Sequence, residues 1–214
     1  MKKYRLILLL LLPIILNSCY NDTLNSLSSF KLQVPINFRS NFYNKAAPDS
    51  TFNFANLSIY KEFNDNVDRI KNAQIYQLTY WIDSLQLENK IPFNPKKDSL
   101  EFEFIRFYLT FAIPKPGHTA AEADSSAWMP DPDSPSYLIG EFNNVNISEY
   151  YRTPKKIISI SEDVAAILSQ AVKNKPQFYL LSEYGKTKGQ KVPVRYFPLI
   201  FARYDLVIRL DVGI

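Results

Sequence analysis

The chain has little of what most catalytic and metal sites are built from. Its 214 residues include one cysteine, Cys19, one histidine, His118, and five glycines. A single cysteine cannot form an intrachain disulfide, and no cluster of histidine and cysteine has the pattern of a zinc site. The few glycines lack the spacing of a phosphate-binding loop. We therefore expect no metal and no cofactor.

The sequence also lacks a convincing set of catalytic groups. A Ser-His-Asp arrangement would have to use His118, which lies in a Pro/Gly loop where a solvated histidine is the simpler interpretation. Glu101 and Glu103 could form a paired-carboxylate site or simply face solvent from one strand, and we favour solvent. A calcium site is a weaker interpretation than a solvated acidic loop for Glu122, Asp124, Asp131 and Asp133. We predict that the protein is not an enzyme.

A long hydrophobic run is present only at the start of the chain. Lys2, Lys3 and Arg5 precede an apolar run over residues 6–16. As a helix this run would span about 16 Å, whereas the hydrocarbon core of a bilayer is ~30 Å thick. The run is too short to cross a membrane and has the charge pattern of an export signal.

The end of this run, Leu16-Asn17-Ser18-Cys19, resembles the lipobox of bacterial lipoproteins. The resemblance implies that residues 1–18 are a signal peptide and that Cys19 becomes the lipidated first residue of the mature protein. An ordinary secretory signal is the alternative, but Leu16 would then occupy a position that normally holds a small residue. Two or three acyl chains on Cys19 would anchor the protein stably in a membrane.

Loss of the signal peptide changes the charge of the chain. Three of the 25 basic residues leave with it, and no acidic residue does, so the mature chain has 22 basic and 21 acidic residues. A nearly neutral chain has no electrostatic basis for binding nucleic acid. We therefore expect the membrane contact to come from the lipid on Cys19.

Residues 19–29 are polar and predict a flexible tether, and residues 30–214 predict one folded domain. Strict alternation of apolar and polar residues predicts strands over 30–38, 76–83 and 204–212. Pro35 lies on the outward side of the first of these, which favours an edge position. Two short helices are expected, one within 60–71 and one over 161–174.

The densest apolar segment, residues 100–113, changes the face on which its apolar residues lie near Phe104-Ile105. Such a change predicts a bulge or a strand that passes between sheets. Many strands and few helices predict an all-β fold, a single antiparallel β-sandwich that is either immunoglobulin-like or jelly-roll-like. We expect the second helix to cover one end of the sandwich.

Three side chains are candidate contacts for a partner or ligand. Residues 114–136 form a long connector with five prolines, and it contains Trp128 and Met129. These two residues could insert into a partner, or Trp128 could fold back onto the sandwich. Trp81 shares a strand face with polar residues and could stack on a sugar or fill a partner pocket. The alternatives are that both faces of its sheet are covered or that Trp81 packs under the first helix.

The lipobox and the strands rich in Phe, Tyr, Asn and Lys resemble uncharacterised β-sandwich lipoproteins of Bacteroidota. This resemblance implies an outer-membrane lipoprotein. Tyr20-Asn21-Asp22 lacks the acidic run of surface-exported members, which favours the periplasmic side. We expect a non-enzymatic accessory or structural protein that docks to an outer-membrane protein partner. The alternative is a glycan-binding module.

Overall fold

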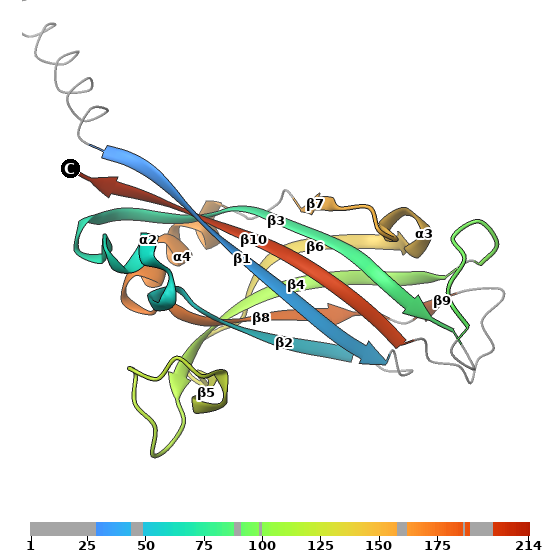
Figure 1. The fold of residues 1–214 in the computed structure, drawn as a ribbon, viewed down its shortest axis with the longest axis horizontal. Helices are drawn as coiled ribbons and strands as arrows, with labels where there is room; N and C mark the ends of the chain where they lie inside the picture. Colours follow the sequence, from blue (N-terminus) through green and yellow to red (C-terminus); the bar gives the residue numbers. More distant parts are fainter. Residues whose placement is uncertain are drawn as a thin grey trace, which may run out of the picture.

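A computed structural model describes residues 29–43, 49–87, 91–98, 100–157, 162–185, 187–188 and 199–214. The predicted signal peptide, the lipidation site Cys19 and the tether as far as residue 28 lie outside these ranges and remain predictions. The described residues form two antiparallel sheets with short helices at their ends (Figure 1).

The first sheet has four strands in the order β1-β10-β3-β7. Their bounds are Ser29–Tyr43 for β1, Leu199–Gly213 for β10, Ile70–Gln86 for β3 and Lys155–Ile157 for β7. In β10, every second residue from Ile200 to Val212 is buried and the residues between are half-buried, as the alternation over 204–212 predicts. Pro35 is exposed on β1, which is an edge strand as expected.

The second sheet is built around β4 (Glu101–Pro114). Its main path runs β2-β8-β4-β5, and two further strands, β6 and β9, also pair with β4. The bounds are Asp49–Asn56 for β2, Gln177–Tyr184 for β8, Trp128–Pro130 for β5, Tyr137–Asn146 for β6 and Thr187–Lys188 for β9. One main core lies between the two sheets and includes Tyr80, Phe107 and Leu206, all fully buried.

The strand pairing distinguishes between the two expected sandwich types. The first strand, β1, pairs with the last, β10; moving inward along the chain, β2 pairs with β8, β3 with β7, and β4 with β6. This nested pairing is that of one long two-stranded ribbon folded over into two sheets. The pairs β10–β3 and β8–β4 then join the ribbon to itself. The described part of the chain is therefore a jelly-roll-like sandwich.

The helices lie at the ends of the sheets. Residues 57–69 contain α2 (Lys61–Asn64) between the 3₁₀ turns η1 (Leu57–Ile59) and η2 (Val67–Arg69). The second predicted helix is α4 (Glu162–Asn174), which buries Leu168 and Val172 in the main core near the start of β3 (Figure 1). A single turn, α3 (Ile147–Tyr150), follows β6 and was not predicted because four residues carry no helical period.

The change of face predicted in β4 is present. Phe102 is buried, Glu103 and Phe104 are half-buried, and burial resumes at Ile105 and Phe107. The pairing of β4 with β6 keeps the same register through this point and β4 stays in one sheet, so the bulge or passage between sheets predicted near Phe104-Ile105 is wrong. A bulge lies further along, where β6 has one extra residue, Ile139, between the partners of Phe107 and Tyr108.

Candidate functional site

The long connector folds back onto the second sheet, and we call residues 114–136 the flap. It contains the 3₁₀ turn η4 (Ser125–Ala127) followed by β5, which pairs with the end of β4. Trp128 is 2% exposed and stacks on Phe54 of β2, with ring centres 5.7 Å apart. Its Nε1 donates to the backbone oxygen of Glu122, and the Tyr179 hydroxyl donates to its carbonyl. This burial favours the alternative in which Trp128 folds back onto the sandwich.

The other two candidate contacts are half-buried. Met129 lies on β5 opposite Ile113. Trp81 lies on the outer face of the first sheet, opposite Arg203 of β10, and Arg203 donates to the Asp83 carboxylate at 3.0 Å. The polar surroundings predicted for Trp81 are therefore present, and its role as a contact remains a prediction.

The polar groups of the flap contact one another and, in the case of Asp131, the residue that follows α4. His118 Nδ1 lies 2.8 Å from a Glu122 carboxylate oxygen, and this contact, with a hydrogen bond from the Thr119 amide, lowers the pKa of Glu122. Asp124 caps η4 by accepting from the Ser126 amide. Asp131 accepts from Lys175, which follows α4. Across the described ranges, no group of three or more histidine, cysteine, aspartate or glutamate side chains is placed so that it could hold a metal ion.

The most organised surface is the outer face of the second sheet. Directly paired residues of antiparallel strands lie on the same face, so the strand register places side chains in rows across the sheet. One row, which we call the apolar row, crosses all four long strands: Phe52 of β2, Leu181 of β8, Tyr108 of β4 and Leu138 of β6. Phe52 is 54% exposed and Leu138 is 40% exposed.

A charged row runs beside the apolar row on the same strands. It consists of Ser50, Glu183, Arg106 and Glu141 in the same order. Arg106 donates to Glu141 at 2.7 Å, which raises the pKa of Arg106, and its guanidinium lies over the Phe104 ring. One arginine between two glutamates leaves this row with one net negative charge. The apolar row is therefore bounded on one side by fixed charges.

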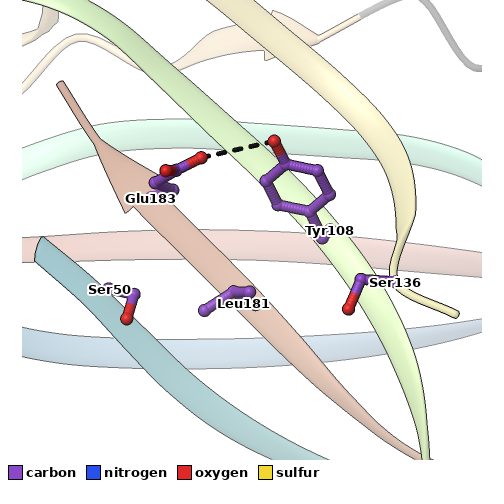
Figure 2. Close-up of a pocket in the computed structure, with 5 residues that line it drawn as sticks. All are labelled: Ser50, Tyr108, Ser136, Leu181 and Glu183. Atoms are coloured by element: carbon purple, nitrogen blue, oxygen red, sulfur yellow. Dashed lines mark hydrogen bonds between the residues drawn. The ribbon is translucent and has the colours of Figure 1, made fainter. Parts of the chain in front are cut away.

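Between the two rows lies an open depression with a volume of about 290 Å³. Figure 2 shows its lining, in which Tyr108 of β4 and Glu183 of β8 face each other. The Tyr108 hydroxyl donates to the Glu183 carboxylate at 3.3 Å, and partial burial together with the negative charge of Glu183 raises the pKa of Tyr108. The remaining lining residues are Ser50, Ser136 and Leu181. The depression thus offers an aromatic side chain, a carboxylate and hydroxyl groups.

A second polar cluster lies inside the core and connects the two sheets. The Tyr204 hydroxyl of β10 shares hydrogen bonds with Ser40 of β1 at 2.8 Å, Ser182 of β8 at 3.0 Å, and the Tyr184 hydroxyl. Ser182 in turn shares a 2.6 Å hydrogen bond with Thr51 of β2. Burial raises the pKa of Tyr204 and Tyr184, so both stay neutral. Without a base among these groups, the cluster is a structural connection rather than a nucleophile site.

Sequence reasoning did not find the apolar and charged rows. The alternation of apolar and polar residues in 100–113 places Arg106 and Tyr108 on the face opposite their buried neighbours. It does not show which residues of the neighbouring strands lie next to them. That information depends on register, which is set by contacts far apart in sequence. The sequence signal that points to this face is the spacing of Phe52 and Phe54, which places two aromatic side chains on one face of the same strand.

No protein-family model matches the chain, and a search of curated protein sequences gives no match. Solved structures give distant likenesses. The decameric BFDV capsid protein has 6% identity and a TM-score of 0.32, and the match covers 85% of this chain and 98% of that chain. A chain from the structure of desmodium yellow mottle tymovirus has 12% identity and a TM-score of 0.19, and the match covers 86% of this chain and 84% of that chain. A chain from turnip yellow mosaic virus has 9% identity and a TM-score of 0.21, with 86% and 96% covered. At these values the likeness carries no conclusion about function. The part of the chain described here contains no helix long and apolar enough to span a membrane.

Proposed function

We propose that this chain is a lipid-anchored protein of the cell envelope that works by binding rather than by catalysis. In this proposal Cys19 carries the lipid, and the sandwich faces the periplasm from the outer membrane. The outer face of the second sheet docks to a protein partner in that membrane. The observation that carries the docking proposal is the apolar row, whose two ends, Phe52 and Leu138, are exposed large apolar side chains.

The arrangement of the two rows suggests the chemistry of the partner. An interface needs an apolar centre and a polar rim, and the apolar row beside the charged row supplies both on one face. Tyr108 at the centre is a residue type that often contributes much of the binding energy. The net negative charge of the charged row favours a partner surface that carries a lysine or arginine beside apolar side chains.

Site-specific photo-crosslinking in intact cells tests the docking surface. A photoreactive residue at position 138 should form an adduct with one outer-membrane polypeptide. The same residue at Tyr76, which is 52% exposed on β3 of the other sheet, should form none. The adduct at 138 should fall several-fold in a Tyr108→Ala/Glu183→Lys variant. Equal adducts at both positions, or none at 138, would contradict the proposal.

The anchor has its own test, which does not depend on the docking surface. Cys19→Ser removes the only thiol in the chain. The protein should move from the membrane fraction to the soluble fraction. Serine at position 19 carries no acyl chains, so the variant lacks the two or three chains that would anchor the unaltered protein. Mass spectrometry of the unaltered protein should find acyl chains on Cys19. An unmodified Cys19 would rule the anchor out.

A glycan-binding module is the second candidate, and the depression is the observation that favours it. Tyr108 offers a ring for stacking, and Glu183, Ser50 and Ser136 offer groups for sugar hydroxyls. Calorimetry of the protein with envelope oligosaccharides should then give binding that Tyr108→Ala abolishes and Tyr108→Phe retains in part. Binding of this kind, together with no adduct at position 138, would replace the docking proposal.

A further inference from the structure

One long edge of the sandwich lacks the features that usually prevent strands of different molecules from pairing. An edge strand presents unpaired backbone N–H and C=O groups, and natural proteins protect such strands with charges, prolines, bulges or short length. β1 carries exposed Lys31, Pro35 and Arg39. β6 carries a bulge at Ile139 and a left-handed residue, Asn144, with φ of 52°. β5, β7 and β9 are at most three residues long as described.

β2 has almost none of these protections along its eight residues, Asp49–Asn56, in which Asp49 at the first position is the only charge. It contains no lysine, arginine or proline, its pairing with β8 is regular from end to end, and within the described ranges it pairs with no other strand. Phe52 stands near its middle and is the most exposed aromatic side chain among those the structure describes. The edge is therefore long, regular, nearly uncharged and apolar on its outer face.

The residues of β2 complement a second copy of the same strand. An antiparallel pair centred on Asn53 would place Phe52 opposite Phe54 of the second copy and Thr51 opposite its Ala55. The outer face of the joint would then hold phenyl rings supported by Trp128 and Tyr179, which already pack on Phe54. The inner face of the pair would hold Thr51, Asn53 and Ala55 from each copy, none of which has a bulky side chain.

Asn53 supplies the observation that favours a copy of this chain over an unrelated strand. Its Nδ2 atom is buried within the single chain and, among the described residues, has no hydrogen-bond partner. Buried donors are nearly always paired in stable structures, so this amide gains by turning toward the open edge, where the half-buried residue is still accessible. On a two-fold axis the two Asn53 side chains, once turned to the edge, would stand opposite each other, where each amide can donate to the other. An unrelated segment would meet this need only by chance.

We propose that two copies of this chain associate through β2, pairing antiparallel about Asn53, so that the second sheet continues from one molecule into the next. The pairing covers one side of the Phe52 ring with Phe54 of the second copy and gives the Asn53 amide a partner once it turns to the edge. It also joins the outer faces of the two second sheets into one surface. This inference does not rest on the proposed docking function, since the edge could pair whatever the face binds.

A single-cysteine experiment in the full-length, lipidated chain tests the pairing, because lipidated Cys19 offers no thiol. Directly opposite residues in an antiparallel pair have Cα atoms about 4.5–5.5 Å apart, within the range that a disulfide spans. Asn53→Cys should therefore form a covalent homodimer on mild oxidation, at a rate roughly tenfold or more above the controls. The controls are Ser50→Cys, off the axis on the same strand, and Tyr76→Cys on β3 of the other sheet.

Two further measurements make the result decisive. Added to the Asn53→Cys variant, Phe52→Lys should remove the covalent dimer and Phe52→Leu should keep it, while circular dichroism confirms that both double variants stay folded. The unaltered protein in detergent should sediment as a dimer and the Phe52→Lys variant as a monomer. Three outcomes would each overturn the proposal: dimers through positions 50 and 76 as fast as through position 53, an adduct of the Asn53→Cys variant with a different protein instead of a homodimer, or a monomeric unaltered protein.

Discussion

At the scale of single residues, the Tyr204 hydroxyl holds the two sheets together by polar contacts. It lies in the middle of the core and shares hydrogen bonds with groups from β1 and β8. Buried hydroxyls in an apolar core cost free energy unless they are paired, and here they pair with one another. Such a cluster favours one alignment of the two sheets, because a shifted strand would leave several of these groups unpaired.

Removal of this hydroxyl should destabilise the fold. Tyr204→Phe keeps the ring and its packing on Tyr80 and Phe107 but leaves Ser40 and Tyr184 each short of a partner. We expect a loss of about 1–3 kcal/mol in the free energy of unfolding, measured by urea denaturation. Tyr76→Phe, on an exposed ring, is the matched control and should change the value by less than about 0.5 kcal/mol. Equal effects of the two changes would contradict this role.

The sequence indicates the two possible surroundings of Trp128 but not the buried polar cluster around Tyr204. Trp128 stood out in a proline-rich connector, and the sequence left open whether it contacts a partner or the sandwich. The structure buries it on Phe54, a residue more than seventy positions away. The polar cluster was not predicted at all, because Ser40, Ser182 and Tyr204 belong to three strands and none is unusual in its own segment. Only the pairing of distant strands brings such groups together.

At the scale of elements, the flap is a long loop held at a few defined points. β5 pairs with the end of β4, Trp128 packs on β2, and Asp131 reaches Lys175 just after α4. Long loops without such contacts usually stay mobile. The prolines of the flap limit the conformations that the unfolded segment can adopt, which reduces the entropy lost when it docks.

The contact between Asp131 and Lys175 predicts a pH-dependent flap. The hydrogen bond from Lys175 lowers the pKa of Asp131 below its ordinary value of 3.8. Because this pKa is lowered, the Asp131–Lys175 contact stabilises the docked flap fully when the pH is above 3.8. This stabilisation is lost as the pH falls through the lowered pKa of Asp131. In a Trp81→Phe background Trp128 is the only tryptophan. Iodide quenching of its fluorescence should therefore rise below about pH 4.

Charge removal at the same contact should reproduce the acid effect at neutral pH. Asp131→Ala should weaken docking of the flap by about 1 kcal/mol or less, because Lys175 is half-exposed and exposed ion pairs contribute little. Asp133→Ala is the control, since only the Asp133 backbone amide contacts Asp131. Quenching of Trp128 should rise in the first variant and not in the second. Unchanged quenching in Asp131→Ala would mean that Trp128 packing alone holds the flap.

The elements themselves were predicted well where one face is buried. Alternation located the strands that became β1, β3 and β10, because those strands face the core on one side only. It located α4 by helical spacing. It did not reveal that β3 runs from Ile70. The register of β3 against β10 shifts three times, at Lys71, Tyr76 and Asp83, and such irregularities break the period. Predictions for residues 189–198 lie outside the described part of the chain.

At the scale of the whole molecule, the order of strand pairing places both ends of the folded domain side by side. β1 and β10, the first and last strands, pair over fifteen residues, so the ends of the domain lie within its longest pairing. The predicted tether precedes β1 directly. A lipid on Cys19 would therefore hold the sandwich at the end where β1 begins and β10 ends, and the depression would lie along the side of the molecule.

The buried tyrosines predict how the whole fold responds to alkali. Burial raises the pKa of Tyr80, Tyr184 and Tyr204, and all three lie in the core between the sheets. A raised pKa means that the folded state keeps protons that the unfolded chain loses, so stability is full below about pH 10 and decreases as the pH rises above it. With three such groups the decrease approaches ~4 kcal/mol per pH unit.

A total stability of about 5–15 kcal/mol would be consumed within a few pH units at that rate. We therefore expect one cooperative unfolding transition above about pH 11, in which tyrosinate absorbance at 295 nm and the loss of circular dichroism coincide for the buried rings. Tyr204→Phe removes one of the three groups, so it should start from a lower stability but show a shallower dependence on pH. Ionisation of all the tyrosines without any loss of circular dichroism would mean that solvent reaches these hydroxyls in the folded state.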